Sequence, residues 1–486
     1  MKLPATNATM TDTQPTNDRG TGLNRRQVLN AAGASYAALN LPGLLQAQAA
    51  APIAGRALSP IKACIFIFYY GGPSHLDTFD MKPDAPSEVR GEFNSIATSV
   101  PGVRVSEHLP MIAAKMHKFA VVRSMNHRMR AHDSASSETL TGRTPPGGDR
   151  ETIADSPQTF PSHGASLSYC WRAKNLPVCH AALPYVMNNV IRNPGQTPGF
   201  LGAAYDPFLI TGDARALTYR AEGLQFPVDI TRQRLDGREA LLNALGREDH
   251  VARAVGNIMG EHYEKAFHLL RSEAVRRALD VQREPEEVRA RYGMTLDHLP
   301  TPEERMARNG AHLEFTRILC GQNLLLARRL VEAGVPFVNV YDYRQQGRNW
   351  DAHADGFKQH KHYLLPQFDR GLVALVDDLE SRGLLDSTLV VGVGEFGRTP
   401  KINKNGGRDH WPDCYSLLLA GGGVHGGALY GSSDKLGMYP ATNPASPADL
   451  AATIFWRFGL DPATEVHDRL GRPFKIADGE PICSLF

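Results

Sequence analysis

The sequence is poor in cysteine, and its six cysteines form none of the short paired motifs that build many metal and redox sites. They stand at positions 64, 170, 179, 320, 414 and 483. No C-x-x-C pair is present, so sites of that kind are excluded. Cys64 and Cys320 fall on apolar positions, where a small buried side chain is expected. An oxidising compartment would allow Cys170 to pair with Cys179.

The chain also lacks an excess of charge of either sign. Its 53 basic and 51 acidic residues leave a formal net charge of +2 over 486 residues. Because nucleic-acid-binding domains gather Lys and Arg in clear excess, this balance does not indicate nucleic acid as a partner. Long hydrophobic runs are missing too. After the first fifty residues no apolar run reaches the length of a membrane span, so none is expected in the mature chain.

The first fifty residues carry the elements of an export signal in the required order. A polar segment precedes Arg25 and Arg26, a weakly apolar run covers residues 31–45, and Ala47-Gln48-Ala49 is a small-residue cleavage motif. This pattern resembles a twin-arginine signal, whose partner is the twin-arginine export machinery. The alternative is a basic helix start after a disordered tail. We expect residues 1–50 to be a signal peptide and disordered N-terminus, and the mature protein to be periplasmic or secreted.

Apolar runs alternate with helical patterns along residues 51–486, which we expect to form one domain. Strands are predicted over residues 61–70, 118–125, 335–341, 389–394 and 416–420, and helices over 107–117, 135–140, 313–333, 357–382 and 448–458. Strands that are apolar throughout are covered on both faces. The alternation therefore predicts an α/β fold with a doubly wound, mostly parallel sheet between helices.

Two stretches interrupt this alternation. Residues 231–312 are helical by pattern for most of their length and are expected to form a helical insertion, either a subdomain or a lid. Residues 193–213 are rich in Gly and Pro and carry three aromatic residues, which predicts a long loop near the mouth of the site.

Carboxylates and imidazoles follow the ends of three predicted strands. The carboxyl ends of parallel strands meet at one edge of a sheet, where ligands bind, so these side chains are expected to converge. Such a ligand set suits a transition metal. We predict one or two divalent ions, zinc first, with manganese or calcium as alternatives. The predicted ligands are His75, Asp77, Asp351, His353, Glu395, Asp409 and His410.

The end of the strand at 118–125 carries candidates for catalysis. His132 is predicted to act as nucleophile, metal ligand or general acid, and Ser134 as an activated hydroxyl or a helix cap. The helix that follows would favour an anion in front of its free N–H groups. Arg398 is expected to act on the oxyanion during catalysis. The residues expected to bind the anionic substrate are His127, Arg128 and Arg408.

Five motifs carry a resemblance to a known family. They are GGPSHLDTFD at 71–80, RVSEHLP at 104–110, LLLARRLVEAG at 324–334, GEFGRTP at 394–400 and GRDHW at 407–411. With them the chain resembles the bacterial family DUF1501, which is placed in the alkaline phosphatase-like superfamily of phosphatases, sulfatases and phosphomutases. The resemblance implies a parallel sheet between helices, a one- or two-metal site at its carboxyl edge and, commonly, twin-arginine export. It implies no substrate.

The superfamily pattern gives some of these residues a role. Asp77 would be the first-strand aspartate with His75 beside it, and His410 the late histidine ligand. Asp351 and His353 would hold the second metal, with Asp355 as a rival.

The chain also departs from this pattern in two places. The superfamily's Asp-His-Gly is replaced by Glu395-Phe396-Gly397, which keeps a carboxylate and loses an imidazole. Residues 140–143 match the sulfatase motif L-T-G-R. The spacing back from that motif leads to His132 in place of Cys or Ser, so a formylglycine sulfatase is not expected.

Two functions of different classes follow from this pattern. The first is an exported metal-dependent hydrolase of phosphate or sulfate esters, with a small or polymeric anionic ester as substrate. The second is an exported, non-catalytic binding or surface-assembly protein on a degenerate hydrolase scaffold, since a fold does not fix a function. Stoichiometric metal that survives dialysis would favour the enzyme.

Overall fold

A computed structural model describes residues 58–156, 158–213, 218–221, 234, 237, 272–294, 311–342 and 350–486. The chain divides into two compact units, and the second, Pro52–Phe486, contains all of these residues. The export signal expected over residues 1–50 lies outside the described residues, as does most of the helical block expected over 231–312. Two short helices of that block are described, α9 (Glu273–Ala278) and α10 (Glu286–Arg291).

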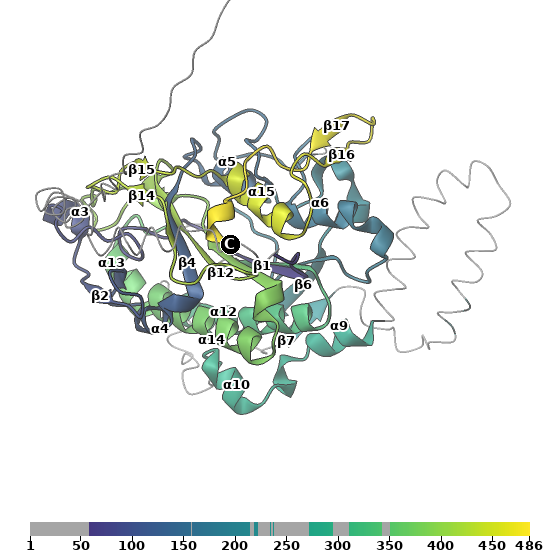
Figure 1. Ribbon diagram of the computed structural model, residues 1–486, viewed down its shortest axis with the longest axis horizontal. Helices are drawn as coiled ribbons and strands as arrows, with labels where there is room; N and C mark the ends of the chain where they lie inside the picture. The colour runs from purple at the N-terminus through teal and green to yellow at the C-terminus, as the bar shows by residue number, and fades with distance from the viewer. Residues whose placement is uncertain are drawn as a thin grey trace, which may run out of the picture. The chain divides into compact units, whose positions relative to one another are not determined.

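A nine-stranded sheet lies at the centre of the second unit, in the order β13-β4-β12-β9-β1-β8-β5-β6-β7 (Figure 1). Its middle strands β1 (Ala63–Tyr69), β8 (Phe337–Asp342), β9 (Thr388–Val393) and β5 (His180–Leu183) run parallel. All seven residues of β1 are buried, which fits a strand covered on both faces. The predicted α/β fold with a large, mostly parallel sheet is confirmed.

One internal strand of the sheet runs against the others. β12 (Tyr415–Gly421) lies between β9 and β4 (Phe119–Met125) and is antiparallel to both, so β4 runs in the same direction as β9. At one end of the sheet β13 (Leu429–Tyr430) pairs in parallel with β4. At the other end β6 (Phe208–Asp213) is parallel to β5 and antiparallel to β7 (Thr218–Ala221).

The prediction of a long loop over residues 193–213 is wrong at its C-terminal end. Residues 208–213 form β6, in which the Ile210 side chain is buried. Gly and Pro are concentrated earlier in the stretch, where short 3-10 turns cover Gly199–Leu201 and Ala203–Tyr205. The loop signal is thus local to the first two thirds of the stretch.

Helices cover both faces of the sheet, as the alternating side chains of β1 show. Ala63, Ile65 and Ile67 belong to one hydrophobic core, which they share with α4 (Pro110–Ala114), α12 (Ala311–Glu332) and α14 (Leu365–Ser381). Cys64, Phe66 and Phe68 belong to a second core with α5 (His132–Thr141), α6 (His163–Cys170) and α15 (Pro447–Arg457). Figure 1 shows these two groups of helices on opposite sides of the sheet. Of the described helices, none has the length and apolar character needed to span a membrane.

Local sequence explains where the main helices start and stop. Ser446 and Asp449 form a capping box at the start of α15, and Pro447 follows in the first turn. Gly334 after α12 and Gly383 after α14 adopt positive φ of 90° and 68°. A residue with a Cβ rarely adopts this conformation, so glycine ends both helices before a strand, as the sequence predicts.

The remaining elements are short. α3 (Ser87–Arg90) and α13 (Gly356–Gln359) are single-turn helices, and α13 continues through a π-helical turn, His360–Leu364, into α14. The two-stranded pairs are β2 (Ser95–Ala97) with β3 (Arg104–Ser106), β10 (Gly397–Arg398) with β11 (His410–Trp411), β14 (Ser432–Ser433) with β15 (Pro440–Thr442), and β16 (Glu465–His467) with β17 (Pro473–Lys475).

Candidate metal centre

The candidate site lies at the carboxyl edge of the sheet. Phe68 of β1 pairs with Tyr341 of β8 and Val393 of β9, so these three strands end almost level. The loops that leave these strands, together with the loop after β4, carry the site residues. Because β12 reverses direction between β9 and β4, the carboxyl end of β4 lies at the same edge. This is where ligand sites of α/β sheets form.

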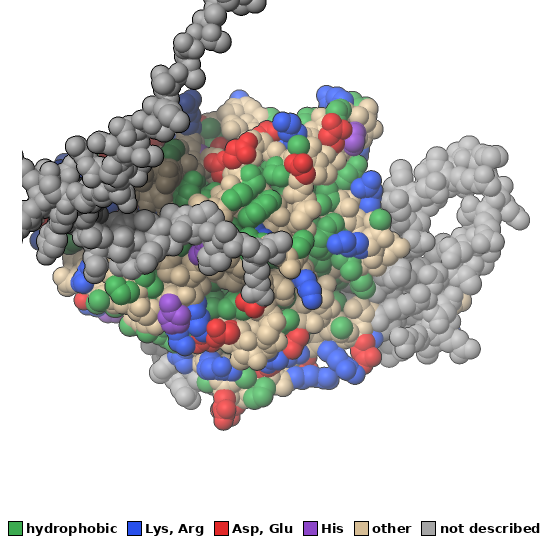
Figure 2. Space-filling view, in the orientation of Figure 1, with side chains coloured by type: hydrophobic (Ala, Val, Ile, Leu, Met, Phe, Trp, Pro, Cys, Tyr) green, Lys and Arg blue, Asp and Glu red, His purple; other side chains and the backbone are tan. Residues whose placement is uncertain are grey.

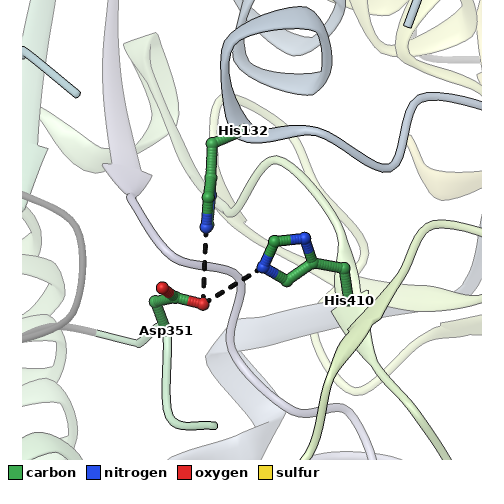
Figure 3. A group of neighbouring side chains, drawn as sticks. All are labelled: His132, Asp351 and His410. Carbon is green, nitrogen blue, oxygen red and sulfur yellow. Dashed lines mark hydrogen bonds and ion pairs between the residues drawn. The ribbon is translucent and has the colours of Figure 1, made fainter. Parts of the chain in front are cut away.

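One carboxylate oxygen is the centre of the cluster (Figure 3). Asp351 Oδ1 lies 3.4 Å from His132 Nε2, 2.9 Å from His353 Nε2 and 3.2 Å from His410 Nε2. The Nε2 atoms of His353 and His410 are 3.0 Å apart. The structure therefore brings together four nitrogen and oxygen atoms from segments about 60 to 220 residues apart in sequence.

The other ring nitrogen of each histidine contacts an oxygen at 2.7 Å. His132 Nδ1 meets Glu395 Oε1, His353 Nδ1 meets Asp409 Oδ1, and His410 Nδ1 meets the carbonyl oxygen of Arg130. A carbonyl oxygen can only accept, so His410 donates from Nδ1, and in its neutral form it presents a lone pair on Nε2. Metal-binding histidines are held in this way by carboxylates and carbonyls.

Arg398 neutralises the central carboxylate from the buried side. Its Nη2 donates to Asp351 Oδ1 at 2.6 Å, and its other contacts go to the carbonyl oxygens of Gly71, Gly72 and Arg408. The guanidinium thus makes four hydrogen bonds within the protein and is buried. The prediction that Arg398 acts on a substrate oxyanion does not fit this arrangement.

The charged neighbours shift the pKa values of the cluster. Burial alone would raise the pKa of Asp351, but hydrogen bonds from three histidines and the Arg398 charge hold it well below its usual range. Burial would lower the pKa of His132, yet Asp351 and Glu395 raise it to about 9. The hydrogen bond to Asp351 raises the pKa of His353, whereas burial lowers that of His410.

The known separations between these atoms are close to those between the ligands of a small divalent ion. Ligands at about 2.0 to 2.1 Å from a tetrahedral zinc ion lie about 3.3 Å from one another. The four separations given above fall between 2.9 and 3.4 Å. Within the described residues, His132, Asp351 and His410 form a group of three such side chains whose ligand atoms all lie within 4.8 Å of one another.

Access to the cluster is uneven. The side chains of His132 and Asp351 are 0% and 3% exposed, whereas that of His353 is 42% exposed. His410 is 20% exposed and stacks on the buried ring of Phe396, 4.5 Å away between centroids. Phe396 replaces an expected imidazole and packs against two histidine rings of the cluster. The solvent side of the site is therefore the side of His353.

His75 and Asp77, both predicted ligands, do not join the cluster. Asp77 binds Arg408 through two hydrogen bonds, from Nε at 2.8 Å and from Nη2 at 3.0 Å, and both side chains are buried. Burial would raise the pKa of Asp77, but Arg408 lowers it. His75 Nε2 contacts the carbonyl oxygen of Gly437. His75 and Asp77 therefore connect loops of the protein. Because Arg408 is paired with Asp77, it does not have the free guanidinium that the predicted binding of a substrate anion requires.

Glu395 and Asp409 reach the cluster through imidazoles. Glu395 Oε1 also accepts a hydrogen bond from the backbone of Gly71 at 2.7 Å, and Asp409 Oδ1 accepts one from Asn403 at 3.1 Å. Both carboxylates contact the Nδ1 side of a ring, away from the converging Nε2 atoms. Asp355, the rival ligand, is exposed, and its backbone hydrogen bonds go to Asn405 in the adjoining loop and to Gln359 in α13.

The loop before α5 differs from its prediction as an anion cradle. Asp149 accepts hydrogen bonds from the backbone of Arg130 and Ala131 and from the Ser134 hydroxyl, at 2.7 to 3.0 Å. Glu151 accepts one from the backbone of His132 at 3.0 Å. Two acidic side chains thus occupy the N–H groups expected to bind an anion. Ser134 is a buried member of this cap.

Of the two other predicted substrate-binding residues, one is buried and one is exposed. His127 is buried and contacts the carbonyl oxygen of Glu395 at 2.6 Å, and burial lowers its pKa to about 4. Arg128, the next residue, is exposed. Arg130, two residues further along this loop, is exposed as well, but it pairs with Asp413 at 2.5 Å.

Sequence reasoning missed three groups that support the cluster. They are the carbonyl oxygen of Arg130, the Asn403 side chain and the acid cap of α5. A backbone carbonyl has no sequence signal. Asn403 lies in the turn Asn403-Lys404-Asn405-Gly406-Gly407, whose Asn and Gly content indicates a turn but not its contacts.

Fold and site together define an α/β protein with a histidine and aspartate cluster at the carboxyl edge of its sheet. The family model "Protein of unknown function (DUF1501)" matches residues 61–486. The chain belongs to this family, which confirms the resemblance noted from its motifs. No curated protein matches the chain.

Several solved structures show a distant likeness. Ps i-CgsB in complex with k-i-k-neocarrahexaose has 12% identity and a TM-score of 0.39, covering 83% of this chain and 72% of that one. The sulfatase PsFucS1 from Pseudoalteromonas sp. has 13% identity and a TM-score of 0.36, covering 89% and 72%. The phosphonate monoester hydrolase SpPMH from Silicibacter pomeroyi has 12% identity and a TM-score of 0.35, covering 87% and 76%.

Proposed function

We propose that this protein binds one divalent metal ion through His132, Asp351, His353 and His410 and hydrolyses phosphate or sulfate esters. The observation that carries the proposal is the convergence of three Nε2 atoms on Asp351 Oδ1, each ring being held at Nδ1 by an oxygen. Zinc suits this set of nitrogen and carboxylate ligands best, and manganese is the main competitor.

The residues of the chain prepare the site for hydrolysis. Asp351 and Arg398 form a buried pair, so the carboxylate stays ionised and ready to coordinate. Glu395, Asp409 and the Arg130 carbonyl fix the three rings. A divalent ion held there would supply Lewis-acid activation of water and of the ester oxygen. The half-exposed His353 marks the side from which water and substrate enter.

The proposal is for one ion because the residues expected to hold a second are otherwise engaged. Asp77 is neutralised by Arg408, and Phe396 stands where an imidazole was expected. Arg398 already places a positive charge 2.6 Å from the oxygen that two ions would share. A second cation beside this guanidinium would meet strong repulsion.

Recognition of an anionic ester is assigned to Arg128. It is exposed on the loop between β4 and α5, three residues after Met125 and four residues before His132. Its guanidinium can bind a phosphate or sulfate group with two parallel hydrogen bonds.

Metal content and turnover of the purified protein test the proposal. After dialysis we expect one zinc or manganese ion per chain by mass spectrometry of the metal. Turnover is measured on aryl phosphates, phosphodiesters and aryl sulfates with zinc, manganese and calcium. D351N should lose both the ion and the activity, whereas D355N, the same change four residues away on an exposed side chain, should keep both.

Other outcomes decide between the two classes of function. One ion without turnover on any ester would favour a non-catalytic binding protein on this scaffold. No ion, or equal metal content in D351N and wild type, would contradict the proposed centre. Export by the twin-arginine route remains part of the proposal, with the periplasm or the medium as destination.

A further inference from the structure

The loop of residues 399–409 is joined to the loop that carries Asp351 and His353. Backbone hydrogen bonds run from Arg408 to Ala352 at 3.1 Å and from Asp355 to Asn405 at 3.1 Å. At Gly407 an added Cβ would lie 2.3 Å from the backbone of His353. Two loops far apart in sequence are thus packed backbone to backbone beside His353.

A single side chain in this loop holds His353 at two points. Asn403 Nδ2 donates to the carbonyl oxygen of His353 at 2.9 Å and to Asp409 Oδ1 at 3.1 Å. Asp409 Oδ1 in turn contacts His353 Nδ1 at 2.7 Å. Asn403 therefore fixes both the backbone of His353 and the carboxylate that orients its ring.

The other half of the same amide organises the turn. Asn403 Oδ1 accepts hydrogen bonds from the backbone N–H groups of Asn405 at 2.9 Å and Gly407 at 3.1 Å. The donors and acceptors of this amide are thus divided between two tasks. The oxygen closes the turn, and the nitrogen reaches His353 and Asp409.

We propose that Asn403 is a positioning residue that sets the ring orientation of His353 and so determines how tightly the centre binds its metal ion. The inference rests on the proposed function for its metal readout. The inference about the geometry of His353 is independent of the proposed function, because the hydrogen bonds of Asn403 fix this geometry without an ion. His353 is the most exposed of the three histidines, with the least packing to hold its ring, so its orientation depends most on such bonds.

Because the nitrogen and the oxygen of the Asn403 amide have different partners, the positioning of His353 can be tested separately from the formation of the turn. N403D keeps two acceptor oxygens for Asn405 and Gly407 and removes both donors. It also places a carboxylate against Asp409, which repels it. If Asn403 serves only the turn, N403D is harmless. If it positions His353, the variant fails although the turn remains.

Asn405 supplies a matched control. It lies in the same turn and is exposed, and its backbone N–H and carbonyl bind Asn403 and Asp355. N405D makes the same chemical change and adds the same charge at nearly the same place. Any general attraction of a new carboxylate for the cation is therefore present in both variants.

Two measurements on the full chain test the proposal. Zinc affinity is determined by competition with a chromophoric chelator, and the ring of His353 is observed by NMR of metal-free protein labelled with ¹⁵N-histidine, assigned with H353Q. N403D should bind zinc about 10 to 100 times more weakly than N405D, in the range found when partners of metal-binding histidines are removed. Its His353 nitrogen signals should move, while N405D keeps those of the wild type. Both variants should melt near the wild-type temperature.

The double variant N403D/D409N supplies a rescue. It restores a hydrogen bond between the two side chains with donor and acceptor exchanged, and should recover part of the lost affinity. Equal zinc affinity and equal His353 signals in N403D and N405D would overturn the positioning role. If the wild type binds no zinc, the proposed function fails, and the His353 signals alone then decide the role of Asn403.

Discussion

At the scale of single residues, His132 and Ser134 have different tasks although they are two positions apart. His132 is fully buried with Nδ1 on Glu395 and Nε2 toward Asp351. The Ser134 hydroxyl donates to Asp149 at 2.7 Å and lies 3.1 Å from the carbonyl oxygen of Ala131. His132 faces the histidine and aspartate cluster and is a proposed metal ligand, whereas Ser134 closes the start of α5.

This difference predicts unequal effects of substitution. H132A should lower turnover by a factor of about 100 or more and remove most of the metal, as expected for loss of a residue in the reacting centre. S134A should keep the metal and change turnover only a few-fold, since a cap contributes about 1 kcal/mol to stability. Parallel measurement of metal content and turnover checks both. Loss of activity in S134A with full activity in H132A would reverse the assignment.

Single residues also show what a sequence can and cannot reveal about the site. Asp351, His353 and His410 follow strand ends, so their convergence could be predicted from apolar runs and the geometry of parallel sheets. The fate of Asp77 could not, because its partner Arg408 is 331 residues away and competes with any metal for the same carboxylate. The N–H groups before α5 were likewise expected to be free, but Asp149 and Glu151, some 15 to 20 residues downstream, bind them.

At the scale of elements, the Asp77 and Arg408 pair joins the loop after β1 to the loop between β10 and β11. D77N would leave the guanidinium of Arg408 buried without its counter-charge, which typically costs about 3 to 5 kcal/mol of stability. Chemical denaturation should show this loss, and the protein should still bind one metal ion. D84N, on an exposed side chain of the following loop, is the control. A D77N protein of normal stability that lacks the ion would instead make Asp77 a ligand.

The contact of α6 with β5 predicts a dependence of stability on pH. Burial lowers the pKa of His163 on α6 and of His180 on β5 from 6.5 to about 4. The unfolded chain therefore binds more protons than the folded one between these values. The contribution of these two histidines to the free energy of unfolding is complete above pH 6.5. It is lost as the pH falls from 6.5 toward 4, by about 3 kcal/mol for each histidine.

Urea denaturation at several pH values tests this prediction. H180Q supplies an amide that can donate to Asn339 Oδ1, which is the partner of His180 Nε2 at 2.8 Å. The variant should lose less stability than the wild type as the pH falls. H117Q, which changes an exposed histidine, is the control. An unchanged slope in H180Q would show that His180 does not contribute.

Elements were predictable where one signal dominated. The buried strands and the glycine ends of α12 and α14 followed from apolar runs and from the need for positive φ. β6 was not predicted, because it gains its order by pairing with β5 at the end of the sheet, a contact that local composition does not show.

At the scale of the whole molecule, the twin-arginine pair predicts where the protein acts. Replacing Arg25 and Arg26 with Lys keeps the charge and removes the guanidinium groups of the motif. The variant should accumulate inside the cell as full-length precursor, and the wild type should be found outside the cytoplasm in shortened form. Cell fractionation with immunoblotting distinguishes the two, and equal export of both proteins would contradict a twin-arginine signal.

The place of β12 in the sheet has a consequence for the folding of the protein during its synthesis. β12 is made late in the chain, at residues 415–421, yet it is inserted between β9 and β4 in the sheet. Until β12 leaves the ribosome, β4 lacks the strand that connects it to β9, β1 and β8 in the sheet. His410, a proposed ligand, is also made late, so the proposed ion could be bound by the complete set of ligands only when translation is nearly finished. A protein exported in the folded state would carry with it the ion that the cytoplasm supplied at that moment.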